Sequence, residues 1–266
     1  MKNIIILLSL VGYLNSYSSG NMNSKITQVK AASKGSFDHM HTLLTNVLKK
    51  YVVPGKVSSL VKYDELKKNR SELDNYLKGL ESLSKSDFSK FNNDQKLSFW
   101  INAYNAYTLE LIIDNYPLKS IKDLGSLFKS PWKKKFIKLF NKTMSLDGIE
   151  HDTIRKQFKE PRIHFAVNCA SMGCPSIANE AFTESNLESL LQERSLHFIN
   201  NDMKNSFNAT KKTMKISKIF DWYGVDFNEK FGSYQNFIQT LKPEIKGLAK
   251  FKVKWSNYGW GLNDSK

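Results

Sequence analysis

The segment from Leu97 to Leu109 constrains the fold of this chain more than any other stretch. It reads LSFWINAYNAYTL, so apolar and aromatic side chains fall on nearly every face of a helix. Asn93 or Asp94 is placed to cap this helix, and Pro117 limits it at about Tyr116. A helix that is apolar nearly all round has to be covered by other elements, so the sequence predicts that it is buried on most sides.

Two asparagines interrupt this apolar helix. Asn102 and Asn105 lie three residues apart and therefore share one helix face. A buried asparagine needs hydrogen-bond partners. Such a pair either braces neighbouring backbone or lines a binding site, and bracing is the preferred interpretation.

Helical patterns outnumber strand patterns in the rest of the chain. Further helices are predicted at 37–53, 64–80, 148–158, 185–200, 219–227 and 233–241. Hairpins are predicted at 136–146 and 207–217, and single strands at 162–168 and 251–255. This mixed order predicts an α+β fold, a mainly helical single domain with a small, mostly antiparallel sheet.

The first residues have the pattern of a secretory signal peptide. One lysine precedes a short apolar run, and small residues follow it. The run is too short to span a bilayer comfortably, although a retained anchor is the alternative. We therefore expect a signal peptide at 1–18, a flexible lead-in at 19–35 and one globular domain at 36–266. The mature protein is then periplasmic or extracellular, with no stable membrane span.

The net charge of the chain is +15, and lysine dominates it. Such a charge is compatible with nucleic acid, anionic lipid or acidic glycan partners. The lysines are dispersed, however, and the densest run is only Lys133–Lys135. A solvated basic surface is therefore the preferred interpretation. We expect no nucleic-acid partner, and an unknown small-molecule, peptide or glycan ligand of the cell envelope instead.

The chain has two cysteines, Cys169 and Cys174, in the loop 168–175. In an exported protein a local disulfide is the simplest interpretation. The alternative makes Cys169 a nucleophile, whose thiolate needs a nearby cation, helix start or general base. A third hypothesis takes Cys169, Cys174 and His151, with His164 and Glu150, as zinc ligands, but this spacing fits no usual zinc-finger pattern. We expect no cofactor.

Two histidines are candidates for the general base. His151 is the first choice because it lies in the first turns of a predicted helix, with Glu150 beside it and Arg155 one turn further on. Neighbouring residues on a helix point about 100° apart, so Glu150 need not orient His151. His164 is the second choice, because strict strand alternation places it on the opposite face from Cys169.

Several separated motifs occur in an order that is typical of one family. They are Phe99–Ala106, Ile149–His151 with Arg155, Arg162–Ser171 with Cys174-Pro175, Lys218–Tyr223 with Asp226-Phe227, and Tyr258–Asn263. Together they resemble the domain of unknown function 547 family over roughly 97–263. The resemblance implies no settled activity. It implies that the family pattern includes Asn102, Asn105, Glu150, His151, Arg162, His164, Asn168, Cys169, Ser171, Cys174 and Asp221. Polar residues at this density around one loop are more typical of a site than of a core.

These observations support two main hypotheses. In the first, the protein is a thiol-dependent hydrolase or acyltransferase in which Cys169 attacks a carbonyl, His151 or His164 takes the thiol proton, and Glu150 or Asn168 orients the base. Backbone N–H groups near Ser171 then form an oxyanion hole. The candidate binding residues are Asn102, Asn105, Arg155, Arg162, Asn168, Ser171 and Asp221. In the second, the protein is a non-catalytic envelope module with a Cys169–Cys174 disulfide, and Trp222, Tyr223 and Trp260 line a groove. A redox or metal protein that uses both cysteines is a third hypothesis.

Overall fold

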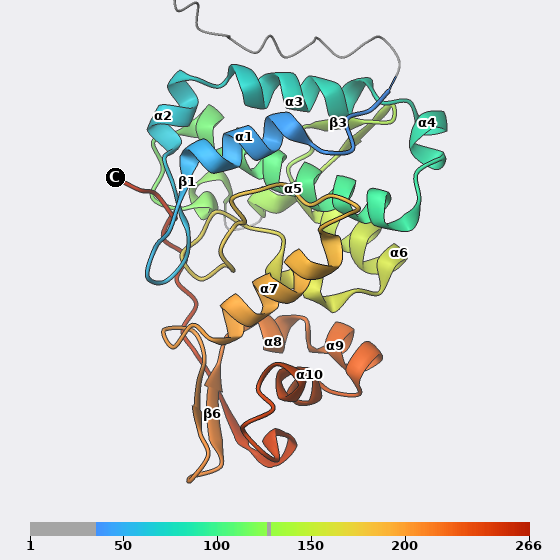
Figure 1. Ribbon diagram of the computed structural model, residues 1–266. Helices are drawn as coiled ribbons and strands as arrows, with labels where there is room; N and C mark the ends of the chain where they lie inside the picture. Colours follow the sequence, from blue (N-terminus) through green and yellow to red (C-terminus); the bar gives the residue numbers. More distant parts are fainter. Residues whose placement is uncertain (1–35, 127–128) are drawn as a thin grey trace, which may run out of the picture. The chain divides into compact units, whose positions relative to one another are not determined.

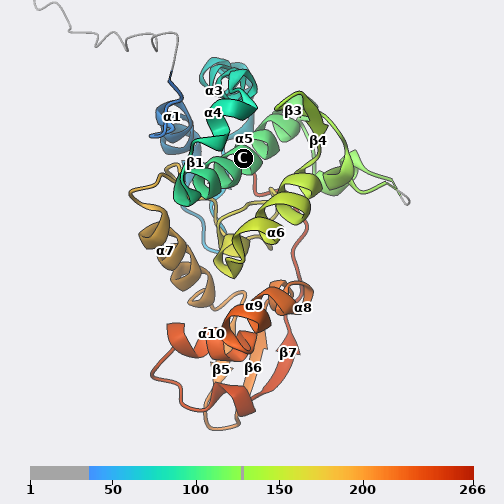
Figure 2. The same cartoon turned by 90° about the vertical axis from the view of Figure 1, so that its right-hand side faces the viewer.

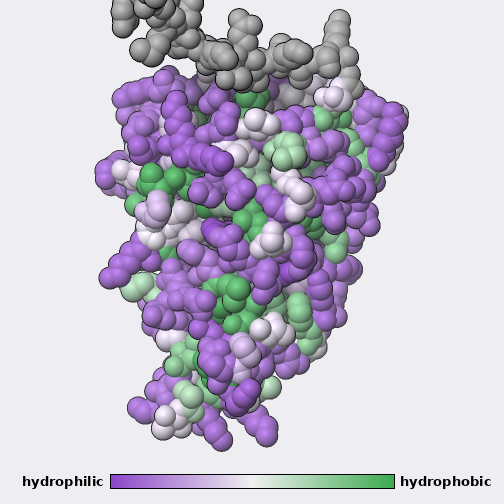
Figure 3. Space-filling view, viewed as in Figure 1, coloured by the Kyte–Doolittle hydropathy of each residue, from purple (hydrophilic) through white to green (hydrophobic). Residues whose placement is uncertain are grey.

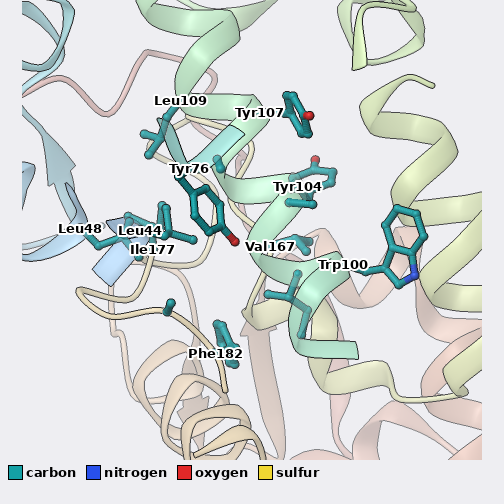
Figure 4. Packing of buried hydrophobic residues seen from close by; sticks show 14 of the residues in the cluster. Leu44, Leu48, Tyr76, Trp100, Tyr104, Tyr107, Leu109, Val167, Ile177 and Phe182 are labelled. Atoms are coloured by element: carbon teal, nitrogen blue, oxygen red, sulfur yellow. The ribbon is translucent and has the colours of Figure 1, made fainter. Parts of the chain in front are cut away.

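Helix α5 (Asn93–Asn115) is buried among other helices, as its sequence predicts (Figure 1). Every residue from Leu97 to Leu109 is buried. Figure 4 shows side chains that leave α5 on opposite sides, with Leu109 on one and Trp100 and Tyr107 on the other. The cap is Asn92, one residue before the predicted positions, and it exchanges hydrogen bonds with Gln95 in a capping box.

The structure is a computed structural model that describes residues 36–126 and 129–266. The predicted signal peptide and lead-in lie outside the described residues. Among those that are described, no helix is both long and apolar enough to cross a membrane. Hydrophilic side chains dominate the face shown in Figure 3, with only small apolar areas between them.

The larger hydrophobic core forms where several helices pack around α5. They are α1 (Thr42–Tyr51), α2 (Tyr63–Lys68), α3 (Ser71–Ser82), α4 (Lys85–Ser89), the π-helix η3 (Gly148–Ile154), α6 (Arg155–Phe158) and α7 (Leu187–Ile199). The single helix predicted at 64–80 is wrong, because Asn69 ends α2: its side chain and its backbone N–H both donate to the carbonyl of Glu65. Short 3₁₀ helices connect these elements at η1 (Ile121–Leu124), η2 (Pro131–Lys133) and η4 (Pro161–Phe165).

The second core is smaller and strongly aromatic. Phenylalanines from several elements meet in it, including Phe165, Phe220, Phe227 and Phe237. It is built by α8 (Ile219–Trp222), α9 (Gly224–Phe231), α10 (Tyr234–Leu241), η5 (Leu248–Lys250) and a three-stranded sheet (Figure 2). Phe165 comes from η4, and Phe198 and Ile199 come from α7, so segments that precede residue 200 complete this core.

The strands are short and form three small sheets. β1 (Val52–Val53) pairs with β2 (Leu60–Val61), and β3 (Ile137–Leu139) pairs with β4 (Lys142–Met144). In the third sheet β5 (Ser206–Asn208) pairs antiparallel with β6 (Thr213–Ile216), which pairs parallel with β7 (Lys252–Trp255). Both predicted hairpins and the last strand are confirmed, and the fold is a mainly helical α+β fold.

The strand predicted at 162–168 is wrong. Pro161 begins the 3₁₀ helix η4, and the side chain of Glu160 accepts a hydrogen bond from the Arg162 N–H. Proline is well suited to a first helical position because its fixed φ matches a helix and its missing N–H costs no bond there. The alternation of polar and apolar residues in this segment therefore reflects a tight helical turn between the two cores.

Candidate functional site

The loop that carries both cysteines is held by buried asparagines. The amide of Asn105 donates to the carbonyl of Ala166 at 2.9 Å and accepts the N–H of Asn168 at 2.9 Å. Asn168 in turn accepts the N–H of Ala170 at 2.8 Å and donates to the carbonyl of Pro175 at 2.7 Å. These bonds fix the backbone on both sides of Cys169, including the left-handed conformation of Ala170.

Asn102 braces a different segment in the same way. Its amide donates to the carbonyl of Phe182 at 2.7 Å and accepts the Phe182 N–H at 3.0 Å. Asn102, Asn105 and Asn168 are all buried and none lines a cavity, so each satisfies backbone groups that have no water to bind.

Cys169 and Cys174 are joined by a disulfide, with their α-carbons 6.1 Å apart. Hydrogen-bond donors surround the two sulfurs. The Tyr258 hydroxyl lies 3.3 Å from the Cys169 sulfur and 3.2 Å from that of Cys174, and the Ser171 hydroxyl lies 3.1 Å from Cys169. The backbone N–H of Cys169 donates to the Cys174 sulfur at 2.9 Å. Donors in these positions would stabilise a thiolate after reduction.

A glycine permits the close approach of Tyr258. A β-carbon on Gly173 would lie 2.7 Å from the Tyr258 ring, which is closer than real contacts allow. The aromatic ring therefore packs directly against the loop backbone and brings its hydroxyl to the sulfurs.

The disulfide borders a cavity of about 350 Å³. Aromatic and acidic side chains from distant parts of the sequence line it. The lining residues are Tyr104, Trp132, Asp147, Glu150, His151, His164, Val167, Cys169, Cys174, Pro175, Ile219, Trp222, Tyr223, Tyr258 and Trp260. Its volume is in the usual range for small-molecule sites.

His164 is the more deeply buried of the two base candidates that line this cavity. It is buried, its ring stacks on Tyr223 with centroids 3.8 Å apart, and its Nε2 lies 2.7 Å from an oxygen of Asp226. Its Nδ1 has no hydrogen-bond partner in the described part of the chain and lies 3.8 Å from Glu150. The strand on which the expectation about His164 rested is wrong, because this segment is helical, and His164 and Cys169 line the same cavity.

Asp226 connects His164 to Arg155. The guanidinium of Arg155 donates two hydrogen bonds to the carboxylate, at 2.6 and 2.7 Å. Burial opposes ionisation of Asp226, but the hydrogen bonds from His164 and Arg155 outweigh it and hold the pKa of this carboxyl far below its usual range. Burial lowers the pKa of His164 despite its contact with Asp226, so its neutral form is favoured.

His151 has different partners from those predicted. Arg155 donates to its Nδ1 at 3.1 Å, and its Nε2 lies 3.4 Å from Asp147. Glu150 does not orient it. Glu150 is itself buried beside Tyr104 and Tyr223. Burial raises the pKa of Tyr104, and the negative charge of Glu150 raises it further.

Other predicted binding residues lie outside the cavity. Arg162 forms ion pairs with Glu160 and Glu188, so its guanidinium is bound to carboxylates of the chain. Asp221 is exposed at the start of α8, and Ser171 is buried behind the disulfide. Arg155 does not line the cavity and contacts the site through Asp226, His151 and the ring of Tyr223.

Sequence reasoning missed Asp147, Asp226 and Tyr258. Asp226 and Tyr258 do occur in the motifs that resemble the family, and this resemblance was the signal in the sequence that pointed to them. Asp226 follows His164 by 62 positions, and Tyr258 follows Cys174 by 84. No local spacing rule connects residues at such separations.

The zinc hypothesis has no support in the geometry. In the part of the chain that the structure describes, no group of three or more His, Cys, Asp and Glu side chains is arranged to hold a metal ion. The two proposed sulfur ligands are bonded to each other.

Residues 88–199 match the family model described as "Protein of unknown function, DUF547". The match covers less than half of the 266 residues, and it ends before the motifs that contain Asp226 and Tyr258. No curated protein matches the chain, and no solved structure matches it. The matched residues 88–199 contain the braced cysteine loop and both candidate bases, so this part of the chain is similar to the DUF547 family.

Proposed function

We propose that this protein is a thiol-dependent hydrolase or acyltransferase in which Cys169 is the nucleophile and His164 is its base. One observation carries the proposal: Cys169 lines the same cavity as a buried histidine whose one ring nitrogen is bound to Asp226 while the other has no partner. Nucleophile, base and orienting carboxylate are the three parts of such a site.

The protonation state of His164 follows from Asp226. Because Asp226 is ionised, its carboxylate can only accept a hydrogen bond from His164. Nε2 of His164 therefore carries the proton, and Nδ1 presents its lone pair. The stacked Tyr223 ring fixes the plane of the imidazole. His164 therefore replaces His151 as the proposed base, and Asp226 replaces Glu150 and Asn168 as the orienting residue.

The proposed reaction begins with reduction of the disulfide by a thiol reductant, which supplies two electrons and two protons. The Cys169 thiol then gives its proton to His164 Nδ1, and the sulfur attacks the substrate carbonyl. The bond to the leaving group breaks as His164 returns the proton to it, which leaves a thioester on Cys169. Water or a second acceptor releases the acyl group.

The oxyanion donors proposed from the sequence need revision. The backbone N–H groups of Met172 and Gly173 already donate to the carbonyls of Gly261 and Gly259. We propose instead the Tyr258 hydroxyl, together with the Cys169 N–H that reduction releases from the Cys174 sulfur.

The test uses matched cysteine variants and an activated ester such as p-nitrophenyl acetate. We expect Cys174→Ala to acylate at Cys169 without reductant, the wild type to require reductant, and Cys169→Ala to fail in both conditions. Mass spectrometry of the trapped protein locates the acyl group. Acylation elsewhere, or at equal rates in Cys169→Ala, would refute the thiol mechanism.

A second candidate function is a non-catalytic binding module of the cell envelope. The formed disulfide and the exposed Trp222 at the cavity favour it. Under this proposal the protein is exported, the disulfide is a permanent staple, and a glycan or peptide occupies the cavity. Ligand binding that persists in a Cys169→Ala, Cys174→Ala double variant, with no acylation of the Cys174→Ala protein, would select this function over the enzyme.

A further inference from the structure

The walls of the cavity carry negative charge in a chain whose net charge is +15. Asp147 and Glu150 both line it, and no lysine or arginine does. The two histidines of the lining have partners of their own: His151 contacts Arg155 through Nδ1 and Asp147 through Nε2, and burial disfavours the charged form of His164. The charge of Arg155 is itself paired with Asp226.

Glu150 is the more buried of these two residues, and only 6% of its surface is exposed. Among the described residues its one ion-pair contact is Nδ1 of His164, at 3.8 Å, which is a neutral nitrogen in the proposed mechanism. A buried carboxylate without a cation is costly unless a partner arrives. Nδ1 of His164 lies beside it and has no hydrogen-bond partner among the described residues. The groups that hydrogen-bond to Glu150 are the hydroxyls of Tyr104 and Tyr223, which are neutral, so no cation of the chain pairs with this carboxylate there.

Another part of the lining is aromatic and continuous. Tyr258 packs on Trp260 with centroids 4.6 Å apart and on Trp222 at 4.8 Å, and Trp132 reaches Trp260 at 5.8 Å. Trp222 is 44% exposed, so a large ring face remains open to a ligand. Rings that line one cavity with carboxylates are typical of sites for organic cations.

Two rings of this cavity already hold cations of the chain. The ammonium of Lys122 lies 3.7 Å from the centroid of the Trp260 ring, and the guanidinium of Arg155 lies 5.2 Å from that of Tyr223. Both contacts are within the range of cation–π attraction. The Lys122 contact shows that one ring of the aromatic wall accepts a cation, while Trp222 has no such contact among the described residues.

We propose that the ligand of this cavity carries a protonated primary amine, such as the side chain of a lysine or another diamino acid. The amine lies between Glu150 and the aromatic wall formed by Trp222, Tyr258 and Trp260. The cavity volume of about 350 Å³ fits one amino-acid side chain with its acyl group. Amine binding does not depend on the proposed function. Only the further statement that the acyl group of this ligand is the one that Cys169 attacks rests on it.

Binding is measured by calorimetry on the full chain in its disulfide form, so that no reaction interferes. The probes are Nα-acetyl-lysine amide, its uncharged analogue Nα-acetyl-norleucine amide and the anionic Nα-acetyl-glutamic acid amide. We expect the lysine probe to bind at least about tenfold more tightly than the norleucine probe, and the glutamic acid probe not to bind.

Three variants locate the site. Glu150→Gln should weaken binding of the lysine probe about tenfold, and Trp222→Ala should weaken it several-fold. The matched control is Asp152→Asn, which removes an exposed carboxylate two residues away that pairs with Lys156, and it should bind as the wild type does. Because Trp222 is exposed, its truncation tests the site even if Glu150→Gln does not fold.

Equal affinity for the lysine and norleucine probes, or unchanged affinity in both Glu150→Gln and Trp222→Ala, would overturn the inference. Amine binding without acylation of Cys169 would support the inference and remove the thiol mechanism. Conversely, if reduced protein is acylated equally fast by p-nitrophenyl esters of acetyl-lysine and acetyl-norleucine, the thiol mechanism stands and the amine specificity fails.

Discussion

The two parts of the chain that meet at the cavity contribute different groups to it. Residues 88–199, which match the family, supply the cysteine loop, His164, Glu150 and the asparagines that brace them. Residues 200–266 supply the carboxylate of Asp226 and the aromatic wall of Trp222, Tyr223, Tyr258 and Trp260. The reactive groups and Glu150 therefore lie in one part, while the carboxylate that orients the base and most of the aromatic lining lie in the other.

Packing joins the same two parts. Phe165 of the first part stacks on Phe237 of the second, and Phe198 packs against Phe220. His164 and Phe165 are neighbours in η4, so the turn that buries Phe165 in the second core also places His164 against Tyr223 and Asp226. The segment matched by the family model therefore contains only part of the candidate site.

The largest effect should come from removing the second part. A chain that ends at Ile199 exposes Phe165, Phe198 and Ile199, which are buried in the second core. We expect it to be insoluble or to lack cooperative unfolding, as judged by the soluble fraction and by thermal melting against the full chain. A soluble, cooperatively folded 36–199 fragment would show that the two parts are independent.

The next effect concerns the base. Asp226→Asn keeps the shape of the side chain but removes the charge that fixes the tautomer of His164. In a Cys174→Ala background we expect acylation of Cys169 to slow by about 10³- to 10⁴-fold. Glu229→Gln, in the same helix and paired with the exposed Lys159, is the control and should react normally. Equal rates in both variants would remove Asp226 from the mechanism.

Two asparagine variants separate bracing from reactivity. Asn105→Ala and Asn102→Ala each remove two hydrogen bonds to buried backbone, so each should lower the free energy of unfolding by about 3 kcal/mol. Urea titration measures this loss. Only Asn105→Ala should also change the alkylation rate of Cys169 in the Cys174→Ala protein, because Asn105 holds Asn168. A change of rate in Asn102→Ala instead would contradict this division.

The smallest effect is a pH dependence in the first core, far in sequence from the cavity. Burial lowers the pKa of His41 to about 4, and its Nδ1 lies 2.7 Å from the Tyr76 hydroxyl. The unfolded chain binds this proton near pH 6.5, so stability falls as the pH drops from about 6.5 towards 4. Between pH 7 and 5 the loss should be about 2 kcal/mol.

His41→Gln provides the comparison for that pH dependence. The variant should be less stable at pH 7 but should lose less stability between pH 7 and 5 than the wild type, as measured by urea unfolding at each pH. If both proteins lose the same amount, the acid sensitivity comes from other groups. Asp226 adds a loss of the same sign, but only below about pH 4, because its pKa is depressed in the folded state.

The fold was largely predictable where the signal is local. The burial of α5 follows from apolar residues on every helix face, and both hairpins follow from short alternating runs. The 3₁₀ helix η4 was not predictable in this way. Its sequence alternates as a strand does, but Pro161 and the side chain of Glu160 favour a helical turn there. Alternation alone does not distinguish a strand from a short helix whose two sides face different cores.

The sequence by itself determined the cysteine loop, the two candidate histidines and the central helix with its bracing asparagines, because each depends on residue types at short spacing. Only the tertiary structure decided between the histidines, joined His164 to Asp226 and brought Tyr258 to the sulfurs. These contacts connect residues more than sixty positions apart. They exist because Phe165, Phe198 and Ile199 are buried in the aromatic core formed by the last quarter of the chain, and burial of apolar side chains does not depend on distance along the sequence.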